Sequence, residues 1–417
     1  MMQGGKLLGT GSSSCVLSPN IPCKKGGEQS DKRVSKLLFH PDSKNLAKYE
    51  KSQYNIIKKI KGYKEWAVVY DEYCDAPTHD VVASIDKEGY EDCFKDGMDD
   101  IGSGIPYHEA QLLNSDHGGE TLSSLFTNMF RGVDNIKGIH DNFKILMRMF
   151  IPLFKGLKEM GENNIVHHDI KGINITGDNE KLKYIDFGLT SKASNISHFK
   201  DRSISESETK RIYYYYPLEY IYFHTDKYKL EMELIGGQIL WRRNYNIMND
   251  IYNDLGYDLY ESIRILYDKL HDSEYKFKDV IKKIDVYSLG IQVPVLFNSV
   301  RYPLDRIMGD PVIADFFDLF KLMVNPDLDE RLTSKESYDI FMGLIKKHKI
   351  IQVNSGKKKP AKKSVKRKEP PRRARATPRR ARATPRRARA TPRRARATPR
   401  RARATPRRAR ATPRRAR

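Results

Sequence analysis

Apolar and polar residues follow two recurring patterns along residues 1–350. Short apolar runs bounded by turn residues predict strands, and these runs lie at 34–39, 66–70, 110–113, 165–166 and 182–185. Longer stretches with apolar residues three or four positions apart predict helices, and these lie at 45–60, 143–161 and 248–270. Pro152 interrupts the second of these helices and is expected to kink it. The pattern therefore predicts a chain of mixed strands and helices, long enough for a sizeable core.

Acidic, basic and amide residues lie close together in the sequence, after each of the strands predicted at 165–166 and 182–185. Asp169, Lys171 and Asn174 come first, and Asp186 stands before Phe-Gly twelve residues after Asn174. Phosphoryl transfer needs charges to be positioned and needs little covalent work from the protein. Asp169 could accept a hydroxyl proton, and Lys171 could contact the moving phosphoryl group. Asn174 and Asp186 offer the oxygen ligands that Mg²⁺ prefers. The alternative is a pair of surface turns with incidental acids.

This stretch reads H-H-D-I-K-G-I-N followed by D-F-G, and it closely resembles the catalytic loop and metal-binding motif of the protein kinase superfamily. The resemblance spans about 7–350 and implies an α+β, two-lobed kinase-like fold. It implies a small β-rich N-lobe at 1–113 and a large helical C-lobe at 114–350. ATP and Mg²⁺ are the implied cofactors, and proteins are the implied substrates. The lysine at 171, two residues after the catalytic acid, implies Ser/Thr specificity.

A glycine-rich stretch precedes the first predicted strand. Gly9 and Gly11 let a backbone turn come close to phosphate oxygens, although a G-x-G loop alone is equally typical of a flexible tail. Beside the catalytic-loop resemblance, it implies the glycine-rich flap over ATP. Val16 stands where the family has valine, and Ser14 replaces the third glycine of the family's motif.

A lysine and a glutamate are implied to bind or align the nucleotide. Lys36 is the one charge in the strand predicted at 34–39, and the resemblance implies that it contacts the α- and β-phosphates. An outward lysine on an edge strand is the alternative. Glu50 is the only acid of the helix predicted at 45–60, and it is implied to pair with Lys36. A solvated glutamate on the helix face is the alternative.

Four further residues have implied structural roles. His167 is implied to support the metal-binding motif from the core, where a catalytic base is the alternative. Asp285 begins D-V-Y-S-L-G, which matches the start of the central helix of the lobe, and it is implied to bond the catalytic-loop backbone. Glu219 ends Y-Y-P-L-E, which resembles the A-P-E motif, and it is implied to pair with Arg331 inside the helical lobe.

His168 departs from the family, which has arginine before the catalytic acid. That arginine commonly pairs with a phosphate on the activation segment, and a neutral imidazole pairs poorly. We therefore hypothesise activity that needs no phosphorylation of the segment 190–209, which is rich in Ser and Thr and is expected to be mobile. Enzyme that is inactive after removal of phosphate and recovers on phosphorylation of this segment would contradict the hypothesis.

Several details extend the resemblance. Residues 114–119 match the hinge, and their Gly-Gly suits a bend before a helix that begins near Thr121. Residues 71–105 and 224–280 are insertions with no assigned role. The short N-terminus, the Gly-Gly, the segment end and the second insertion resemble Ser/Thr kinases of large nucleocytoplasmic DNA viruses, in particular iridovirus-like ones. This implies a location in the cytoplasm or nucleus of a host cell, or association with a virion.

The cysteines and the apolar runs indicate the cellular compartment in which the chain is expected. The four cysteines, at 15, 23, 74 and 93, form no C-x-x-C pair and no zinc-like cluster. Reduced thiols in a cytosolic or nuclear setting are therefore expected. The N-terminus has no apolar signal region, and no apolar run reaches the length of a membrane span, so no membrane association is expected.

The positive charge of the chain belongs to its C-terminal end. The formal net charge is +23, but residues 357–417 carry 29 Lys and Arg against Glu369, which leaves −5 for residues 1–356. Within 372–413, Arg-Arg-Ala-Arg-Ala-Thr-Pro repeats six times. Large apolar side chains are missing there, so residues 351–417 are predicted to be a disordered basic tail. Such a tail suits salt-dependent binding of DNA or RNA phosphates, and a solubilising or nuclear-targeting tail is the alternative.

Three functions remain open from the sequence. The first is an active Ser/Thr protein kinase, and the intact set Lys36, Asp169, Asn174 and Asp186 favours it. The second is a nucleic-acid-binding or condensing protein whose kinase-like body is a scaffold. The third is a small-molecule kinase on the same fold, which the segment end at Glu219 and the arginine at 331 disfavour.

Overall fold

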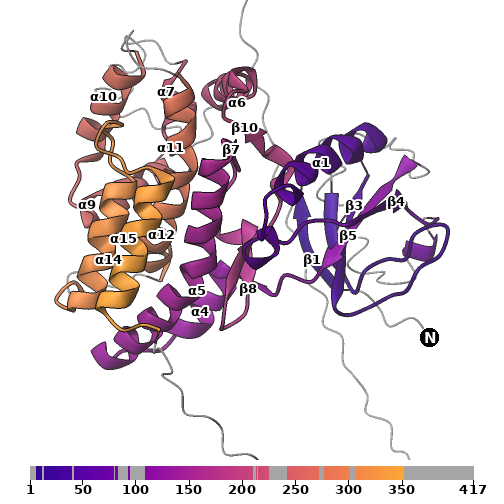
Figure 1. Cartoon of the computed structure of the whole chain (residues 1–417), viewed down its shortest axis with the longest axis horizontal. Coiled ribbons are helices and arrows are strands. Elements are labelled where there is room, and N and C mark those ends of the chain that lie inside the picture. The colour runs from indigo at the N-terminus through magenta and orange to yellow at the C-terminus, as the bar shows by residue number, and fades with distance from the viewer. Residues whose placement is uncertain are drawn as a thin grey trace, which may run out of the picture. The chain divides into compact units, whose positions relative to one another are not determined.

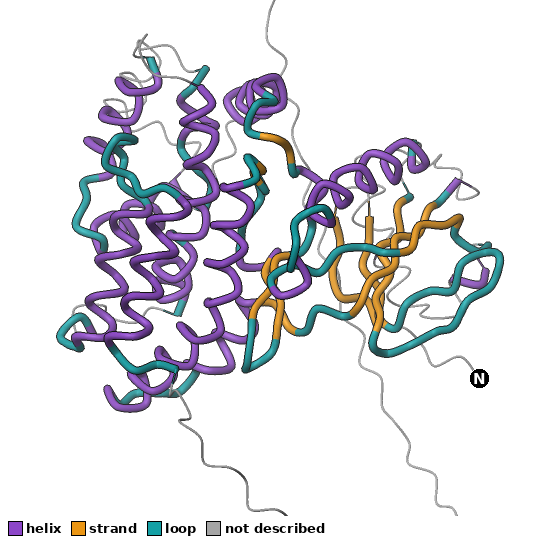
Figure 2. Tube along the Cα trace, in the orientation of Figure 1, coloured by secondary structure: helices purple, strands orange, loops and turns teal. Residues whose placement is uncertain are grey.

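The computed structural model has a β-rich N-terminal region and a helical C-terminal region, so the fold is α+β (Figure 1, Figure 2). The chain divides after Asn354, and the tail beyond it lies outside the described residues. None of the described helices is both long enough and apolar enough to cross a membrane. The structure describes residues 6–11, 14–39, 42–78, 80–82, 93, 109–209, 213, 215–224, 242–271, 277–300 and 307–351.

The N-terminal region is built on a five-stranded antiparallel sheet with the order β1-β2-β3-β5-β4. The register places Val16 beside Lys36 and Lys36 beside Leu113, so the lysine lies on a central strand. Helix α1, Ser43–Lys58, packs on this sheet through β3 and β5. The strands are β1 Lys6–Gly11, β2 Ser14–Ser18, β3 Arg33–Leu38, β4 Glu72–Asp75 and β5 Gln111–Asp116.

The strand predicted at 66–70 does not form. Only Ala67 makes an isolated bridge, with Tyr184, and the next strand along the chain is β4. The apolar residues of this stretch are instead buried in the core shared with the helices. Trp66 lies against Gly156, where an added Cβ would come 2.8 Å from the indole, and its Nε1–H donates to Glu159 Oε2 at 2.6 Å. A short apolar run can form a strand or can be buried in a core without pairing as a strand, and its spacing alone does not decide between the two.

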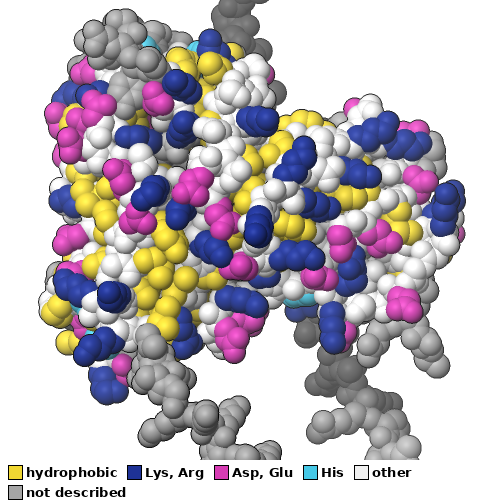
Figure 3. Space-filling view, in the orientation of Figure 1, with side chains coloured by type: hydrophobic (Ala, Val, Ile, Leu, Met, Phe, Trp, Pro, Cys, Tyr) yellow, Lys and Arg dark blue, Asp and Glu magenta, His cyan; other side chains and the backbone are white. Residues whose placement is uncertain are grey.

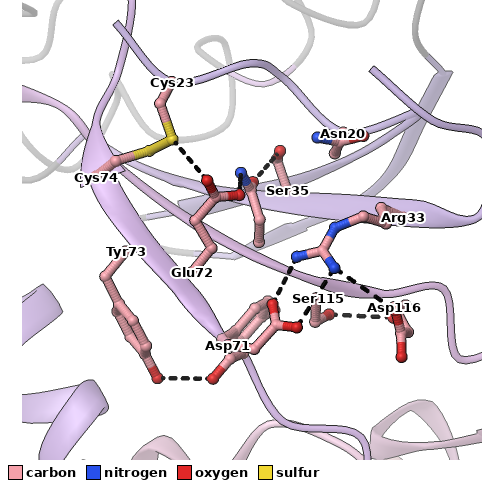
Figure 4. A network of polar contacts seen from close by, with 12 residues as sticks. Asn20, Cys23, Arg33, Ser35, Asp71, Glu72, Tyr73, Cys74, Ser115 and Asp116 are labelled. Atoms are coloured by element: carbon pink, nitrogen blue, oxygen red, sulfur yellow. Dashed lines mark hydrogen bonds and ion pairs between the residues drawn. A yellow bond between two sulfur atoms is a disulfide. The ribbon is translucent and has the colours of Figure 1, made fainter. Parts of the chain in front are cut away.

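The expectation of reduced thiols is wrong, because the four cysteines form two disulfides. Cys15 pairs with Cys93, and Cys23 pairs with Cys74 (Figure 4). The Cα atoms of the pairs lie 5.9 and 5.8 Å apart, although the partners are 78 and 51 residues apart in the chain. Only the folded sheet reveals this proximity, which is within the reach of a disulfide. Because disulfides persist mainly in oxidising surroundings, cysteine usage no longer supports an intracellular location.

The helical region surrounds one large apolar core, through which α5 runs. The stacked rings of Phe154 and Phe341, 3.8 Å between centroids, join α5 to α15. The helices are α4 Leu122–Phe130, α5 Ile136–Glu162, α6 Ile196–Thr209, α7 Glu219–Tyr222, α9 Arg242–Asp254, α10 Leu259–Leu270, α11 Phe277–Gly290, α12 Gln292–Ser299, α14 Pro311–Met323 and α15 Ser334–Lys347.

Some helix predictions differ from the structure. The helix predicted at 248–270 is two helices, α9 and α10, and Gly256 between them has a φ of +74° that favours glycine. The segment 190–209, expected to be mobile, contains α6. Pro152 lies inside the continuous α5, and Asp285 lies near the end of α11 and not at its start. Most of the predicted insertion at 71–105 lies outside the described residues, as do residues 225–241 and 272–276 of the one at 224–280.

Short strands and turns between the two regions carry four of the polar residues singled out above: Asp169, Lys171, Asn174 and Asp186. Gly119, with a φ of +98°, leads into them, and an added Cβ there would lie 2.0 Å from the carbonyl oxygen of Gly177. Thr121 then caps α4 by accepting from the backbone of Ser124. The short strands are β6 Glu120–Thr121, β7 Ile165–Val166, β8 Ile175–Gly177, β9 Leu182–Tyr184 and β10 Ser191–Lys192, in the sheets β6-β8-β9 and β10-β7.

Candidate functional site

Lys36 lies at the centre of a buried cluster of charges. Its Nζ contacts both carboxylate oxygens of Glu50, at 2.9 and 3.0 Å, and Oδ1 of Asp186 at 3.3 Å. The side chains of Lys36 and Glu50 are buried, whereas that of Asp186 is 41% exposed. Strand β3 supplies the lysine and α1 supplies the glutamate, so the N-terminal region brings two charges to an acid of the other region.

The charges of this cluster stabilise one another. Burial alone would lower the pKa of the Lys36 amine, but the carboxylates of Asp186 and Glu50 outweigh burial and raise it well above its usual range. The positive charge of Lys36 in turn is the main reason that the pKa of Asp186 is lowered. Burial raises the pKa of Glu50, and the contact of both its oxygens with Lys36 opposes that effect. Lys36 and Asp186 are therefore charged at neutral pH.

Asn174 and Asp186 lie next to each other at one end of a short hairpin. Strands β8 and β9 pair with Ile175 opposite Tyr184, and the N–H of Ile185 donates to the carbonyl of Asn174 at 3.0 Å. Asp186 directly follows and has a φ of +57°, a backbone conformation uncommon outside glycine. The hairpin ladder therefore brings together the two predicted metal ligands.

Asp169 is buried among polar neighbours. Its Oδ2 accepts from Asn174 Nδ2 at 2.8 Å and lies 3.0 Å from Lys171 Nζ. Asn174 Nδ2 also donates to the Asp169 carbonyl at 3.0 Å. The side chain of Asn174 thereby fixes the loop from 169 to 174, and the structure brings three of the predicted site residues within one hydrogen-bonded group.

Helix α11 fixes the backbone before Asp169 through hydrogen bonds. The carboxylate of Asp285 accepts from the N–H groups of His167 and His168, at 2.6 and 3.0 Å. Nδ1 of His167 accepts from the N–H of Asp169 at 3.3 Å, which leaves Nε2–H to donate to the carbonyl of Ile185 at 3.1 Å. The predicted structural roles of Asp285 and His167 agree with these bonds.

His168 bonds residues of two later segments, Ser191 on β10 and Tyr220 on α7. Its ring nitrogens bond the hydroxyls of Tyr220 at 2.5 Å and of Ser191 at 2.8 Å. Burial is the main reason that the pKa of His168 is well below its usual value, and the nearby His198 and Arg202 add to the effect. The imidazole is therefore neutral at physiological pH.

Glu219 and Arg331 form a buried ion pair away from the site. The guanidinium Nη1 donates to Glu219 Oε1, Nε donates to the carbonyl of Asn325 at 2.8 Å, and the guanidinium also lies over the ring of Tyr287. Both charged side chains are almost fully buried. The pair predicted between residues 112 positions apart is present and joins α7 to the loop between α14 and α15.

The predicted glycine-rich residues lie on β1 and β2. Gly9 pairs with Val16 in the hairpin, Val16 pairs with Lys36, and an added Cβ at Gly9 would meet no atom within 4 Å. Glycine at 9 is therefore not required by packing within the chain. Gly11 ends β1, and the two residues after it lie outside the described part.

Two residues beside Asp169 could not be found from sequence. Arg202 Nη2 lies 3.8 Å from Asp169 Oδ1, and the hydroxyl of Tyr216 donates to the same oxygen at 3.5 Å. Arg202 belongs to α6, which the sequence did not predict. Tyr216 belongs to Y-Y-P-L-E, whose resemblance to A-P-E gives no indication of contact with Asp169.

The oxygens of Asn174 and Asp186 suit a hard cation. Because the amide nitrogen of Asn174 faces Asp169, its amide oxygen is directed away from that bond. Among the described residues, no group of three or more His, Cys, Asp or Glu could hold a metal. Mg²⁺ needs no such group, since it usually takes one or two protein oxygens together with phosphates and water.

Comparison with known proteins shows no family for this chain. No family model matches it, and no curated protein matches it significantly.

Proposed function

We propose that the chain is a Ser/Thr protein kinase that uses ATP and Mg²⁺, with a two-lobed kinase-like fold. The observation that carries the proposal is the contact of one buried lysine, Lys36, with Glu50 and Asp186 beside the group formed by Asp169 and Asn174. Residues of this kind, converging from both regions, supply what phosphoryl transfer needs: a fixed cation, ligands for a metal and an acid that can take a proton.

Lys36 and the first hairpin would bind the phosphates of ATP. Glu50 holds the Lys36 amine in place, and the amine stays charged because two carboxylates face it. Gly9 lies on β1 beside Val16, and among the described residues no atom lies within 4 Å of the place where a side chain would begin. These contacts would bind ATP in a fixed position and would neutralise part of its charge.

Asn174 and Asp186 would hold Mg²⁺ through their side-chain oxygens. When bound, Mg²⁺ would screen the charge that builds up on the phosphate oxygens during transfer. Asp186 is well suited to this position because Lys36 keeps its pKa low, so that it is ionised at neutral pH. The bond from Asn174 Nδ2 to Asp169 fixes the amide before any ligand arrives.

Asp169 and Lys171 would act at the acceptor. A Ser or Thr hydroxyl oxygen forms a new bond to the γ-phosphorus, and the bond from that phosphorus to the β–γ bridging oxygen breaks as ADP leaves. Asp169 takes the hydroxyl proton, and the Lys171 ammonium stabilises the transferring oxygens. The resemblance of Asp169-Ile170-Lys171 to Ser/Thr kinases supports this acceptor class.

The test is incorporation of radioactive phosphate from ATP into dephosphorylated casein, with and without Mg²⁺. Asp169→Asn and Lys36→Met should each lower the rate by about 10²-fold or more, because each removes a group needed in the transition state. Asp178→Asn is the matched control, since Asp178 bonds only backbone N–H groups of its own turn among the described contacts. Equal incorporation by wild type and both variants would contradict the proposal.

A second function is favoured by the charge of the tail. Acidic and basic side chains are interspersed over the face of the body in Figure 3, whereas residues 357–417 alone carry a net +28. We propose that the tail binds DNA or RNA phosphates without sequence choice, with affinity that falls steeply as salt rises. Full-length chain should bind a nucleic-acid duplex with a strong salt dependence, and chain that ends at Asn354 should not. Equal binding by both would contradict the tail's role.

A further inference from the structure

The two carboxylate oxygens of Asp169 have different surroundings. Oδ2 faces Asn174 and Lys171, the side assigned above to the metal and the phosphoryl group. Oδ1 faces Tyr216, whose hydroxyl donates to it at 3.5 Å, and Arg202, whose Nη2 lies 3.8 Å away. Oδ1 is therefore the oxygen that an acceptor hydroxyl would have to reach, and two side chains of the chain itself already lie against it.

Packing holds both of these side chains in place. The guanidinium of Arg202 lies over the rings of Tyr216 and Tyr220, at 5.1 and 4.8 Å from their centroids. Ser203 on the same helix donates to the carbonyl of Tyr220 at 2.8 Å, and the hydroxyl of Tyr220 bonds His168. Tyr216 is itself buried. Cation–π contacts between partly desolvated groups stabilise such an arrangement, so the contact with Asp169 is part of how α6 and Tyr216 pack.

We propose that Tyr216 and Arg202 form an acceptor cap, which competes with the protein substrate for Oδ1 of Asp169. The inference rests on the proposed kinase function and concerns the regulation of that same site. The phenol hydroxyl of Tyr216 is an O–H donor like the Ser or Thr hydroxyl that must reach Oδ1. Arg202 adds a positively charged side chain on the same side of the carboxylate, with its Nη2 3.8 Å from Oδ1.

The cap leaves the nucleotide side of the site unchanged. Lys36, Glu50 and Asp186 make their contacts without either cap residue, and Oδ2 of Asp169 keeps its bonds. The cap therefore acts on the acceptor step and not on ATP binding. The kinetic signature of this arrangement is a change in kcat with an unchanged KM for ATP.

Tyr216→Phe tests the cap because it removes only the hydroxyl and keeps the ring against Arg202 and Tyr220. The readouts are hydrolysis of ATP with water as acceptor, and phosphorylation of dephosphorylated casein, both with Mg²⁺. We expect kcat to rise about 3- to 10-fold in both assays, the effect of losing one modest hydrogen bond. Arg202→Met, which keeps an apolar stem, should also raise kcat. Tyr213→Phe is the matched control, because its ring stacks on Tyr215 and meets Tyr216 edge-to-face in the same run, and it should leave both rates unchanged.

Three outcomes would overturn the inference. The first is a Tyr216→Phe variant whose kcat is no higher than that of Tyr213→Phe while the wild type turns over ATP. The second is mass-spectrometric detection of phosphate on Tyr216 after turnover, because the hydroxyl would then be an acceptor and not a competitor. The third is the absence of Mg²⁺-dependent ATP binding in wild type and variants, which would overturn the proposed function and the cap together.

Discussion

The two regions of the body are stabilised by different means. In the N-terminal region, buried apolar residues fall into several small clusters around the sheet, and both disulfides lie there. The helical region shares one extensive apolar core and contains the buried Glu219–Arg331 ion pair. A small layer of strands buries too little apolar surface to be stable on that account alone. The comparison indicates that covalent links stabilise the sheet and that apolar packing stabilises the helices.

Loss of one partner of the buried ion pair should have the largest effect on stability. Glu219→Ala leaves the guanidinium of Arg331 buried without its counter-charge, so the free energy of unfolding should fall by about 3–5 kcal/mol. Chemical denaturation with guanidinium chloride measures this change. Lys335→Ala, in an exposed helical pair with Asp339, is the control and should change nothing measurable. If the two variants are equally stable, the pair does not support the helical region.

Removal of one disulfide should have a smaller and more local effect. Changing Cys23 and Cys74 to serine should lower stability by about 2–4 kcal/mol, because the unfolded chain loses a constraint. Hydrogen exchange should become faster in β4, which contains Cys74, and in β5, which pairs with β4 and whose Asn114 donates to Glu72, whereas α5 should keep its protection. Equally fast exchange in both regions would show that the disulfide supports the whole body and would break the comparison.

Acid should destabilise the helical region by the smallest of the three amounts. His168 has a folded-state pKa well below that of the unfolded chain, so the unfolded state binds more protons and stability falls as pH drops below about 6.5. Protonation of His168 in the unfolded chain should lower the free energy of unfolding at pH 5.5 by about 1.4 kcal/mol relative to neutral pH. Unfolding of wild type and of His168→Gln, compared at pH 7.5 and 5.5, measures this loss. If the free energy of unfolding depends on pH equally in wild type and in His168→Gln, the acid effect belongs to other groups, such as His198.

Local spacing was enough to predict much of the fold. Helix α1 and strand β3 lie close to their predicted positions because each has a continuous pattern of its own. The burial of residues 66–70 in the core shared with the helices and the pairing of the cysteines depended on distant partners. An apolar run or a lone cysteine contains no information about those partners. The helix α6 was missed because a Ser-rich sequence with few apolar residues favours a loop by its local preferences, and contacts such as that of Ser203 with Tyr220 decide otherwise.

The contacts of the candidate site also divide into those that local sequence predicts and those that depend on distant packing. Asn174 and Asp186 are joined by one short hairpin, so their proximity follows from a short stretch of sequence. The pairing of Lys36 with Glu50 could be proposed because the resemblance supplied both positions. Arg202 and Tyr216 reach Asp169 only through the docking of α6, and no spacing rule relates residues 202 and 216 to residue 169.

The contact between Lys36 and Asp186 has a consequence for motion between the regions. Its two partners come from opposite regions, whereas the bond from Lys36 to Glu50 stays within one of them. A rotation that separates the regions stretches the 3.3 Å contact, together with others between the regions such as the bond from Trp66 to Glu159, and can leave the 2.9 Å contact intact. A fluorescent or spin-label pair that spans this boundary would consequently report domain opening before any loss of helix α1 from its sheet.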